Sequence, residues 1–227
     1  MIIEIHDVWC KAEAKHSSYL NQLIKTALKK EQPIVGPISQ TTQAVIDFIQ
    51  RNLKTIVSAK TRDFTPVIDD FWTTFPNNSP LQKTAKMLFK RIFDYDSFSN
   101  KRKGWGAYSL CSLARYQVCP YCHLSPTETV NQTTNIKGYR PQLDHFYDKS
   151  RYPFLALSLG NLVPCCDMCN GPKMKHSKDF VATPHLNPLN DTGVLTFALR
   201  PANGNNWDPL FRTLKYPADH YEVHINV

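Results

Sequence analysis

The 227-residue sequence lacks two features that would place it in or across a membrane. No window approaches the ~18 consecutive apolar residues that a membrane-spanning helix needs. The N-terminal stretch MIIEIHDVWCKAEAKH has neither the basic start nor the apolar core of a secretory signal. We therefore expect a soluble, cytoplasmic protein that has no membrane partner.

Acidic residues are scarce, with 19 Asp and Glu against 27 Lys and Arg, and the formal net charge is +8. A basic surplus favours partners that carry phosphates, although many basic proteins bind no nucleic acid. Low-complexity tracts and internal repeats are absent, and hydrophobic residues make up 42% of the chain. This composition is typical of a packed globular protein of one domain, or of one domain with a small appended module.

Apolar residues recur at helical spacing through residues 1–115, after serines or prolines that suit a helix start. The stripes are Leu20, Leu23, Ile24 and Leu28 after Ser17 and Ser18; Val45, Phe48, Ile49, Leu53 and Ile56 after Ser39; Val67, Ile68, Phe71 and Trp72 after Pro66; and Leu81, Ala85, Leu88, Ile92 and Phe93 after Ser79-Pro80. Trp105 to Tyr116 predicts a fifth helix after a basic break. We expect these stripes to pack a core rather than to form a partner-binding surface, although periodicity alone does not separate the two.

The C-terminal part, residues 181–227, has a different character and reads as an extension that packs on the preceding segment. After Gly171 the chain is rich in Pro, Asn and Gly, with short apolar runs. A short apolar run predicts a strand at Val194–Leu199, and alternation of polar and apolar residues predicts another at Tyr221–Val227.

Four of the seven cysteines form two CxxC pairs, Cys119 with Cys122 and Cys166 with Cys169. Two such pairs complete the closed four-thiolate shell of a structural zinc site. Cys165 competes with Cys166 for a place in the shell, and we favour Cys166 because it alone gives the CxxC spacing with Cys169. Such an ion has no open coordination position, so the chemistry must lie elsewhere.

Cys-Pro-Tyr-Cys is also the active-site tetrapeptide of glutaredoxins, in which it follows the first strand of a small thioredoxin-like fold. Here it follows a long helical region, and a second CxxC lies 43 residues further on (positions 123 to 165 intervene). A thioredoxin-like fold has no use for that second pair, and we reject the redox interpretation. His123, directly after the first pair, adds nothing to a shell that four cysteines already fill.

Between the two pairs lies Asp144-His145, and Asn161 and Asn170 flank the second pair. An Asp-His dipeptide alone is a weak signal, and its position inside a zinc clip strengthens it. In a strand the two side chains would point to opposite faces unless the strand twists or bends there. Four basic residues follow the dipeptide and could contact phosphates or be ordinary solvated charges. They are Lys149, Arg151, Lys173 and Lys175.

This order of motifs resembles the HNH endonuclease family with a four-cysteine zinc clip. The likeness covers about 60 residues, from Cys-Pro-Tyr-Cys through Asp-His-Phe-Tyr-Asp-Lys-Ser to Asn-Leu-Val-Pro-Cys-Cys-Asp-Met-Cys-Asn-Gly-Pro-Lys. It implies an α+β protein whose residues 116–180 form a ββα-metal (His-Me finger) core. It also implies that His145 is a general base oriented by Asn161, and that Asp144 and Asn170 hold a catalytic Mg²⁺ or Mn²⁺. Asn170 stands where many family members have a histidine.

The order of its regions and the motif Asp-His-Phe-Tyr…Lys-Ser…Tyr-Pro resemble one branch of this family in particular. That branch is the PtuB family, the HNH nuclease subunits of Septu-type and retron-linked anti-phage systems. That resemblance implies a DNA endonuclease that works with an ATPase partner subunit, PtuA-like, to which the helical region docks. Two alternatives stay open: an RNase on the same fold, and a zinc-stapled nucleic-acid-binding module without catalysis. Asp144, His145, Asn161 and Asn170 favour the enzyme, because a pure binder has no reason to carry them.

Overall fold

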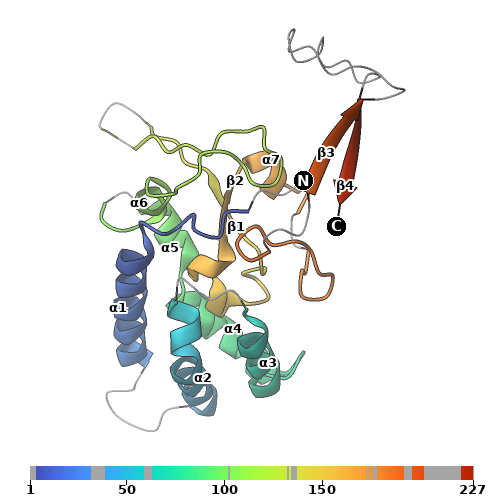
Figure 1. The fold of residues 1–227 in the computed structure, drawn as a ribbon. Helices are drawn as coiled ribbons and strands as arrows, with labels where there is room; N and C mark the ends of the chain where they lie inside the picture. The colour runs from blue at the N-terminus through green and yellow to red at the C-terminus, as the bar shows by residue number, and fades with distance from the viewer. Residues whose placement is uncertain are drawn as a thin grey trace.

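The structure is a computed structural model that describes residues 4–31, 39–58, 63–101, 103–131, 133, 137–172, 174–175, 178–191, 196–201 and 221–226. Helices dominate the first half of the chain, and two small antiparallel sheets lie in the second half (Figure 1). Among the described residues, no helix combines the length and the apolar character that crossing a bilayer requires. The fold is therefore α+β, as the sequence predicts.

The first half of the chain contains six helices in its described part. They are α1 (Glu13–Glu31), α2 (Gln40–Val57), α3 (Thr65–Thr74), α4 (Pro80–Ile92), α5 (Tyr95–Asn100) and α6 (Ala107–Cys111). The starts of three helices are confirmed: Ser39 and Ser79 accept hydrogen bonds from backbone N–H groups of α2 and α4, and Pro66 lies in the first turn of α3.

Two predictions about helix ends are wrong. Helix α1 begins at Glu13, so Ser17 and Ser18 lie inside it, and Ser17 donates instead to the backbone carbonyl of Val57. The helix predicted over Trp105–Tyr116 ends at Cys111. Just beyond that end, the backbone N–H of Arg115 donates to the carbonyl of Val8, so the chain pairs with the N-terminal segment instead of continuing the helix.

The second half holds the elements that position the candidate site. Strands β1 (Gln142–His145) and β2 (Leu162–Cys165) pair antiparallel, with Asp144 opposite Val163 and His145 opposite Leu162. The loop between them contains two 3₁₀ turns, η1 (Pro153–Leu155) and η2 (Leu159–Asn161). One turn of helix, α7 (Asp167–Asn170), follows β2 directly, giving a β–β–α unit.

The C-terminal strands form a separate antiparallel hairpin. Strand β3 (Thr196–Pro201) pairs with β4 (Tyr221–Asn226), and the hairpin stands away from the helices in Figure 1. The two strands confirm the predicted strand segments, and the predicted residues Val194, Leu195 and Val227 lie outside the described residues.

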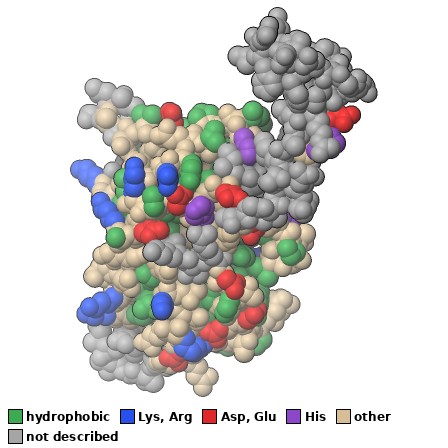
Figure 2. Space-filling view, in the orientation of Figure 1, with side chains coloured by type: hydrophobic (Ala, Val, Ile, Leu, Met, Phe, Trp, Pro, Cys, Tyr) green, Lys and Arg blue, Asp and Glu red, His purple; other side chains and the backbone are tan. Residues whose placement is uncertain are grey.

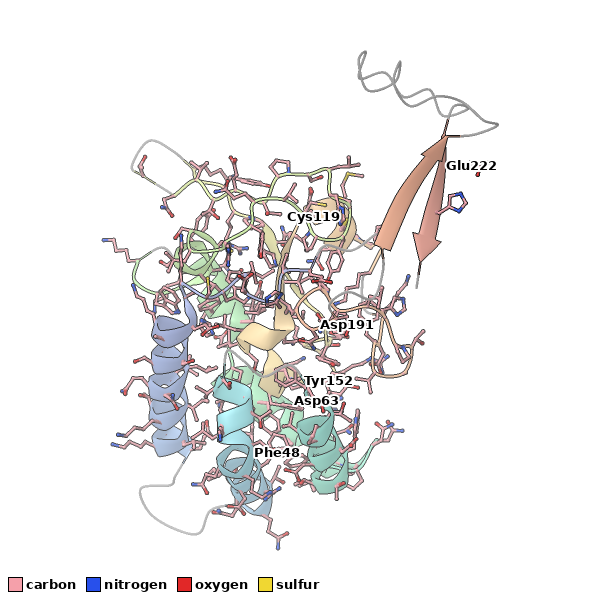
Figure 3. The ribbon with its side chains drawn as sticks, in the orientation of Figure 1. Phe48, Asp63, Cys119, Tyr152, Asp191 and Glu222 are labelled. Carbon is pink, nitrogen blue, oxygen red and sulfur yellow. The ribbon has the colours of Figure 1, made fainter. Side chains whose placement is uncertain are left out.

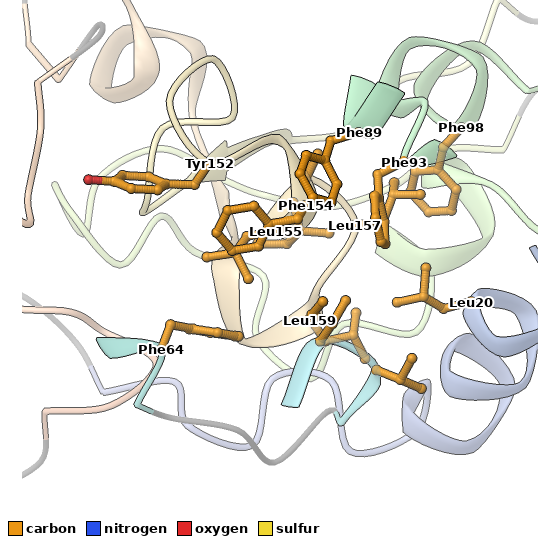
Figure 4. Packing of buried hydrophobic residues seen from close by; sticks show 14 of the residues in the cluster. Leu20, Phe64, Phe89, Phe93, Phe98, Tyr152, Phe154, Leu155, Leu157 and Leu159 are labelled. Carbon is orange, nitrogen blue, oxygen red and sulfur yellow. The ribbon is translucent and has the colours of Figure 1, made fainter. Parts of the chain in front are cut away.

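One hydrophobic core joins the helices to the loop between β1 and β2. Phe154 of η1 packs among phenylalanines of the helices, with ring centroids 5.0 Å from both Phe48 and Phe71 and 5.7 Å from Phe89. Figure 4 shows Phe154, Leu155 and Leu157 of the loop surrounded by side chains of the helices. The helical stripes therefore serve core packing.

Buried polar groups reinforce the same junction. The indole N–H of Trp9 donates to the carbonyl of Leu162 at 2.9 Å, and Ser158 donates to that of Ile56 at 2.8 Å. The Nε2 atom of His16, which is fully buried, lies 2.7 Å from the carbonyl oxygen of Leu157. Buried polar groups need such partners, so these bonds fix the loop against the helices. The boundaries predicted at residues 115 and 180 stay predictions.

Candidate metal centre and active site

The four cysteines of the two CxxC pairs meet at one point. Their sulfur atoms all lie within 4.8 Å of one another, and those of Cys122 and Cys166 are 3.9 Å apart. A tetrahedral zinc ion with Zn–S bonds of about 2.3 Å holds its sulfurs about 3.8 Å apart, so the cluster fits such an ion. Figure 3 places Cys119 beside α7, at the opposite end of the molecule from Phe48.

The electrostatics of the cluster also call for a cation. The backbone N–H of Leu124 donates to the sulfur of Cys122 and lowers the pKa of that thiol to about 6. Burial raises the pKa of Cys119 and of Cys169. Four adjacent thiols therefore do not all ionise unaided, and a bound metal ion supplies the positive charge that makes four thiolates stable together. A structural metal such as zinc is consistent with this chemistry.

Cys165 lies outside the cluster, as the CxxC spacing predicts. It is the last residue of β2, opposite Gln142, and is fully buried. Cys166 instead caps α7, and its sulfur accepts the N–H of Cys169 at 3.4 Å. His123 lies near Pro120, with its Nε2 atom 3.1 Å from that carbonyl oxygen, and is not part of the cluster.

Asp144 on β1 is buried beside the cluster and has a partner at each carboxylate oxygen. The ammonium of Lys175 lies 2.6 Å from Oδ1, and the hydroxyl of Tyr121 donates to Oδ2 at 2.8 Å. Burial raises the pKa of Asp144, and Lys175 and Tyr121 oppose that rise. Tyr121 belongs to the first CxxC pair and Lys175 follows the second, so both arms of the zinc clip reach the same carboxylate.

His145, the next residue, is also buried and has different neighbours. Its Nε2 atom lies 3.0 Å from the carbonyl oxygen of Ala156, and its ring packs against Tyr95 with centroids 4.4 Å apart. A carbonyl oxygen can only accept, so Nε2 carries the proton and Nδ1 has the free lone pair. Burial lowers the pKa of His145 to about 3, which keeps the imidazole neutral near pH 7.

Asn161 is the last residue of η2, directly before β2, and its side chain bonds to the backbone at two places in the loop. Its Oδ1 accepts the N–H of Tyr147 at 2.7 Å, and its Nδ2 donates to the carbonyls of Tyr147 and Leu155 at 3.0 and 3.1 Å. The carbonyl of Leu155 precedes that of Ala156, which holds His145. Asn161 can therefore orient His145 through the backbone, without touching the ring.

The remaining predicted site residues are spread around this centre. Asn170 is half-buried at the end of α7. Lys149 lies 3.5 Å from Asp96, and Arg151 lies 3.4 Å from Asp179. Lys173 falls outside the described residues. The phosphate-contact roles of these basic side chains stay predictions, and in the described structure Lys175 is buried against Asp144.

The sequence did not reveal the partners of the dipeptide, Tyr121, Lys175 and Tyr95. In the sequence, Tyr121 is only a spacer between two predicted zinc ligands, and Lys175 reads as a phosphate contact or a solvated charge. Tyr95 lies far away in sequence, in a helix that was not predicted. Period-two alternation did predict the separation of the dipeptide, since Asp144 and His145 contact different neighbours.

The donor set around Asp144 does not fit a divalent cation as it stands. Both carboxylate oxygens are already bonded, and one of them carries a buried ammonium at ion-pair distance. A dication beside that ammonium would meet like-charge repulsion in a poorly solvated place. The four cysteine sulfurs, by contrast, converge at a spacing that could hold a metal ion.

Comparisons with known proteins find similarity in one segment. Septu protein PtuB from Bacillus thuringiensis is 41% identical over 51 residues, which are 22% of this chain and 19% of that protein. The chain thus matches about a fifth of the length of this relative. No protein-family model and no solved structure matches the chain.

Proposed function

We propose that the chain is an HNH-type endonuclease that hydrolyses phosphodiester bonds in DNA with the help of Mg²⁺ or Mn²⁺. The observation that carries the proposal is the state of His145 in the β1–β2–α7 unit. Its Nε2–H is committed to the carbonyl of Ala156, which leaves Nδ1 as a proton acceptor. The four-cysteine cluster joins the two ends of the unit, and Asn161 bonds to the backbone of the loop between its strands.

In this proposal each residue has a task that its contacts suit. His145 takes a proton from the attacking water through Nδ1, and Asn161 keeps the loop carbonyls where they orient the ring. Lys149, whose ammonium lies 4.3 Å from the ring centroid of Tyr95, supplies positive charge near the same ring that packs on His145. The need for a divalent cation, held by Asp144 and Asn170, rests on the family resemblance.

We further propose that this nuclease serves in defence against phage. The similarity to Septu protein PtuB and the resemblance to nuclease subunits of Septu-type systems support this role. An ATPase partner, PtuA-like, would bind the helical region and control the nuclease. Co-expression with an ATPase encoded beside this chain, followed by affinity purification, tests the partnership, and failure of the two proteins to co-purify counts against it.

A plasmid-relaxation assay tests the nuclease. Zinc-loaded protein, alone and with its partner, is incubated with supercoiled plasmid in Mg²⁺, Mn²⁺ or EDTA. We expect relaxed and linear plasmid with the cations only, and a loss of at least 100-fold in rate for His145→Gln. His16→Gln is the matched control, because it removes a buried histidine with the same type of carbonyl bond outside the site.

The control variant should cleave at the wild-type rate at temperatures where it is folded. Binding of nucleic acid without cleavage in any condition would contradict the proposal and favour the zinc-stapled binding module. A labelled single-stranded RNA run beside the plasmid separates the DNase from the RNase. Cleavage of the RNA alone would show that DNA is not the substrate, while phosphodiester hydrolysis would still be the reaction.

A further inference from the structure

The ion pair between Lys175 and Asp144 is the feature of this centre that a simple metal site does not explain. The side chains of Lys175 and Asp144 are only 7% and 2% exposed. Burying two charges costs several kcal/mol per ion before their attraction is counted, so a gain in stability does not by itself explain the pair. The pair lies where the resemblance would put a divalent cation.

The surroundings of the ammonium are those of a cation site. Besides Oδ1 of Asp144, Lys175 Nζ contacts the backbone carbonyl oxygen of His145 and lies 5.1 Å from the ring centroid of Phe180. A carboxylate oxygen and a carbonyl oxygen are also the ligands that Mg²⁺ and Mn²⁺ prefer. The same two oxygens therefore suit either the ammonium or a metal ion.

From this geometry we infer that Lys175 is an internal cation that occupies the divalent-cation position and must leave before a metal ion binds. The inference rests on the proposed function, and it gives that site a closed resting state. An ammonium and a dication cannot share Oδ1 of Asp144, because their repulsion at 3–4 Å amounts to several kcal/mol even at an effective dielectric constant of about 20.

The structure also provides a place for the displaced side chain. A cleft of about 470 Å³ opens beside the ion pair, and its lining includes Tyr121, Cys169, Lys175, Lys178 and Phe180. A phosphodiester that enters this cleft would attract the ammonium away from Asp144. The phosphate contact predicted for Lys175 is then the second position of the same side chain, and it links the arrival of substrate to the binding of metal.

A titration of zinc-loaded protein with Mn²⁺ tests the inference and needs no cleavage assay. The electron paramagnetic resonance signal of free Mn²⁺ measures how much of the ion is bound. We expect Lys175→Met to bind Mn²⁺ at least tenfold more tightly than the wild type, and Lys175→Arg to bind like the wild type. Adding Asp144→Asn to Lys175→Met should abolish this binding. Lys178→Met is the matched control, because it removes an exposed lysine of the same cleft and should change the affinity less than twofold.

Zinc content and circular dichroism show whether each variant is folded. If Lys175→Met fails to fold, Lys175→Gln keeps a donor for Asp144 without the charge and should show the same gain. Equal or weaker Mn²⁺ binding after removal of the charge would overturn the inference and make Lys175 a structural residue. Mn²⁺ affinity is measured apart from cleavage. If the variants show these affinities but the protein cleaves no nucleic acid, the proposed nuclease activity is wrong and the replacement of Lys175 by a metal ion still holds.

Discussion

Tyr121 ties the first CxxC pair to β1 through one hydrogen bond. Its hydroxyl donates to the buried Oδ2 of Asp144, and burial raises the pKa of Tyr121, so the hydroxyl stays protonated. We expect Tyr121→Phe to lower the free energy of unfolding by about 1–3 kcal/mol, because it leaves a buried carboxylate oxygen without a donor. Urea denaturation of the zinc-loaded protein measures the change.

Tyr116→Phe is the control for that prediction. The hydroxyl of Tyr116 donates to Asp7 at 2.5 Å, but both residues are partly exposed and Asp7 also pairs with Arg115. Water can replace the lost donor there, so the expected cost is below about 1 kcal/mol. If both variants lose the same free energy of unfolding, the buried hydrogen bond to Asp144 stabilises the protein no more than the exposed bond to Asp7.

His16 gives the protein a pH dependence of known sign. Burial lowers the pKa of His16 from its ordinary value of 6.5 to about 4. The unfolded chain therefore takes up this proton first as the pH falls, so the stability is complete above pH 6.5 and is lost between pH 6.5 and 4. The full shift corresponds to about 3 kcal/mol, of which roughly 1.4 kcal/mol is lost between pH 7.5 and 5.5.

Urea denaturation of wild type and His16→Gln at pH 7.5, 6.5 and 5.5 measures this contribution as a difference between the two proteins. The wild type should lose stability more steeply, and His6→Gln, which alters an exposed histidine, should follow the wild type. Zinc is quantified at each pH so that loss of metal is not mistaken for the histidine. Parallel pH profiles of wild type and His16→Gln would contradict the assignment.

At the scale of elements, the sequence predicts most where the signal is local. Ser39 and Ser79 mark the starts of α2 and α4 because a capping side chain bonds within its own turn. The end of α6 was missed because it depends on Val8, about a hundred positions earlier in the chain. Likewise, spacing found the four cysteines, whereas the partners of Asp144 and His145 come from segments that only the fold brings together.

The adjacent cysteines at the end of β2 allow a sharp test of the metal cluster. Cys166 turns into the cluster as the cap of α7, and Cys165 is buried in the strand. We expect the wild type to bind one zinc ion per chain and Cys166→Ala to bind much less, because three thiolates hold the ion far more weakly. Cys165→Ala should keep it, as measured by plasma mass spectrometry. Full zinc in the Cys166 variant would mean that Cys165 can replace it.

At the scale of the whole molecule, the distribution of surface charge says less about function and domains than the hydrophobic core does. On the face shown in Figure 2, Lys and Arg side chains lie mostly on the side of α1 and Asp and Glu toward the other side. Such a distribution suits attraction of a polyanion but does not locate a binding site. The core is more informative, because it does not divide at residue 115 as the sequence pattern does.

The helices and the zinc-bearing segment should therefore unfold together. Phe154 packs on Phe48, Phe71 and Phe89, and polar bonds join the same loop to α1 and α2. In a urea titration, the fluorescence of Trp9, Trp72 and Trp105 reports the helical part, and a colorimetric chelator reports zinc release. We expect one midpoint for both signals, as for a single cooperative unit.

Phe154→Ala tests whether a shared midpoint reflects cooperative unfolding or two separate transitions that happen to coincide. Removing a buried phenylalanine costs about 3–5 kcal/mol, and the shared core requires both signals to shift to lower urea by the same amount. Met87→Ala on α4, where the side chain is 65% exposed, should move neither signal by more than about 0.5 kcal/mol. If zinc release kept its midpoint while the tryptophan signal shifted, the zinc-bearing segment would be an independent domain. The contacts of Phe154 would then not couple the two parts, and the boundary at residue 115 would stand as the sequence pattern predicts.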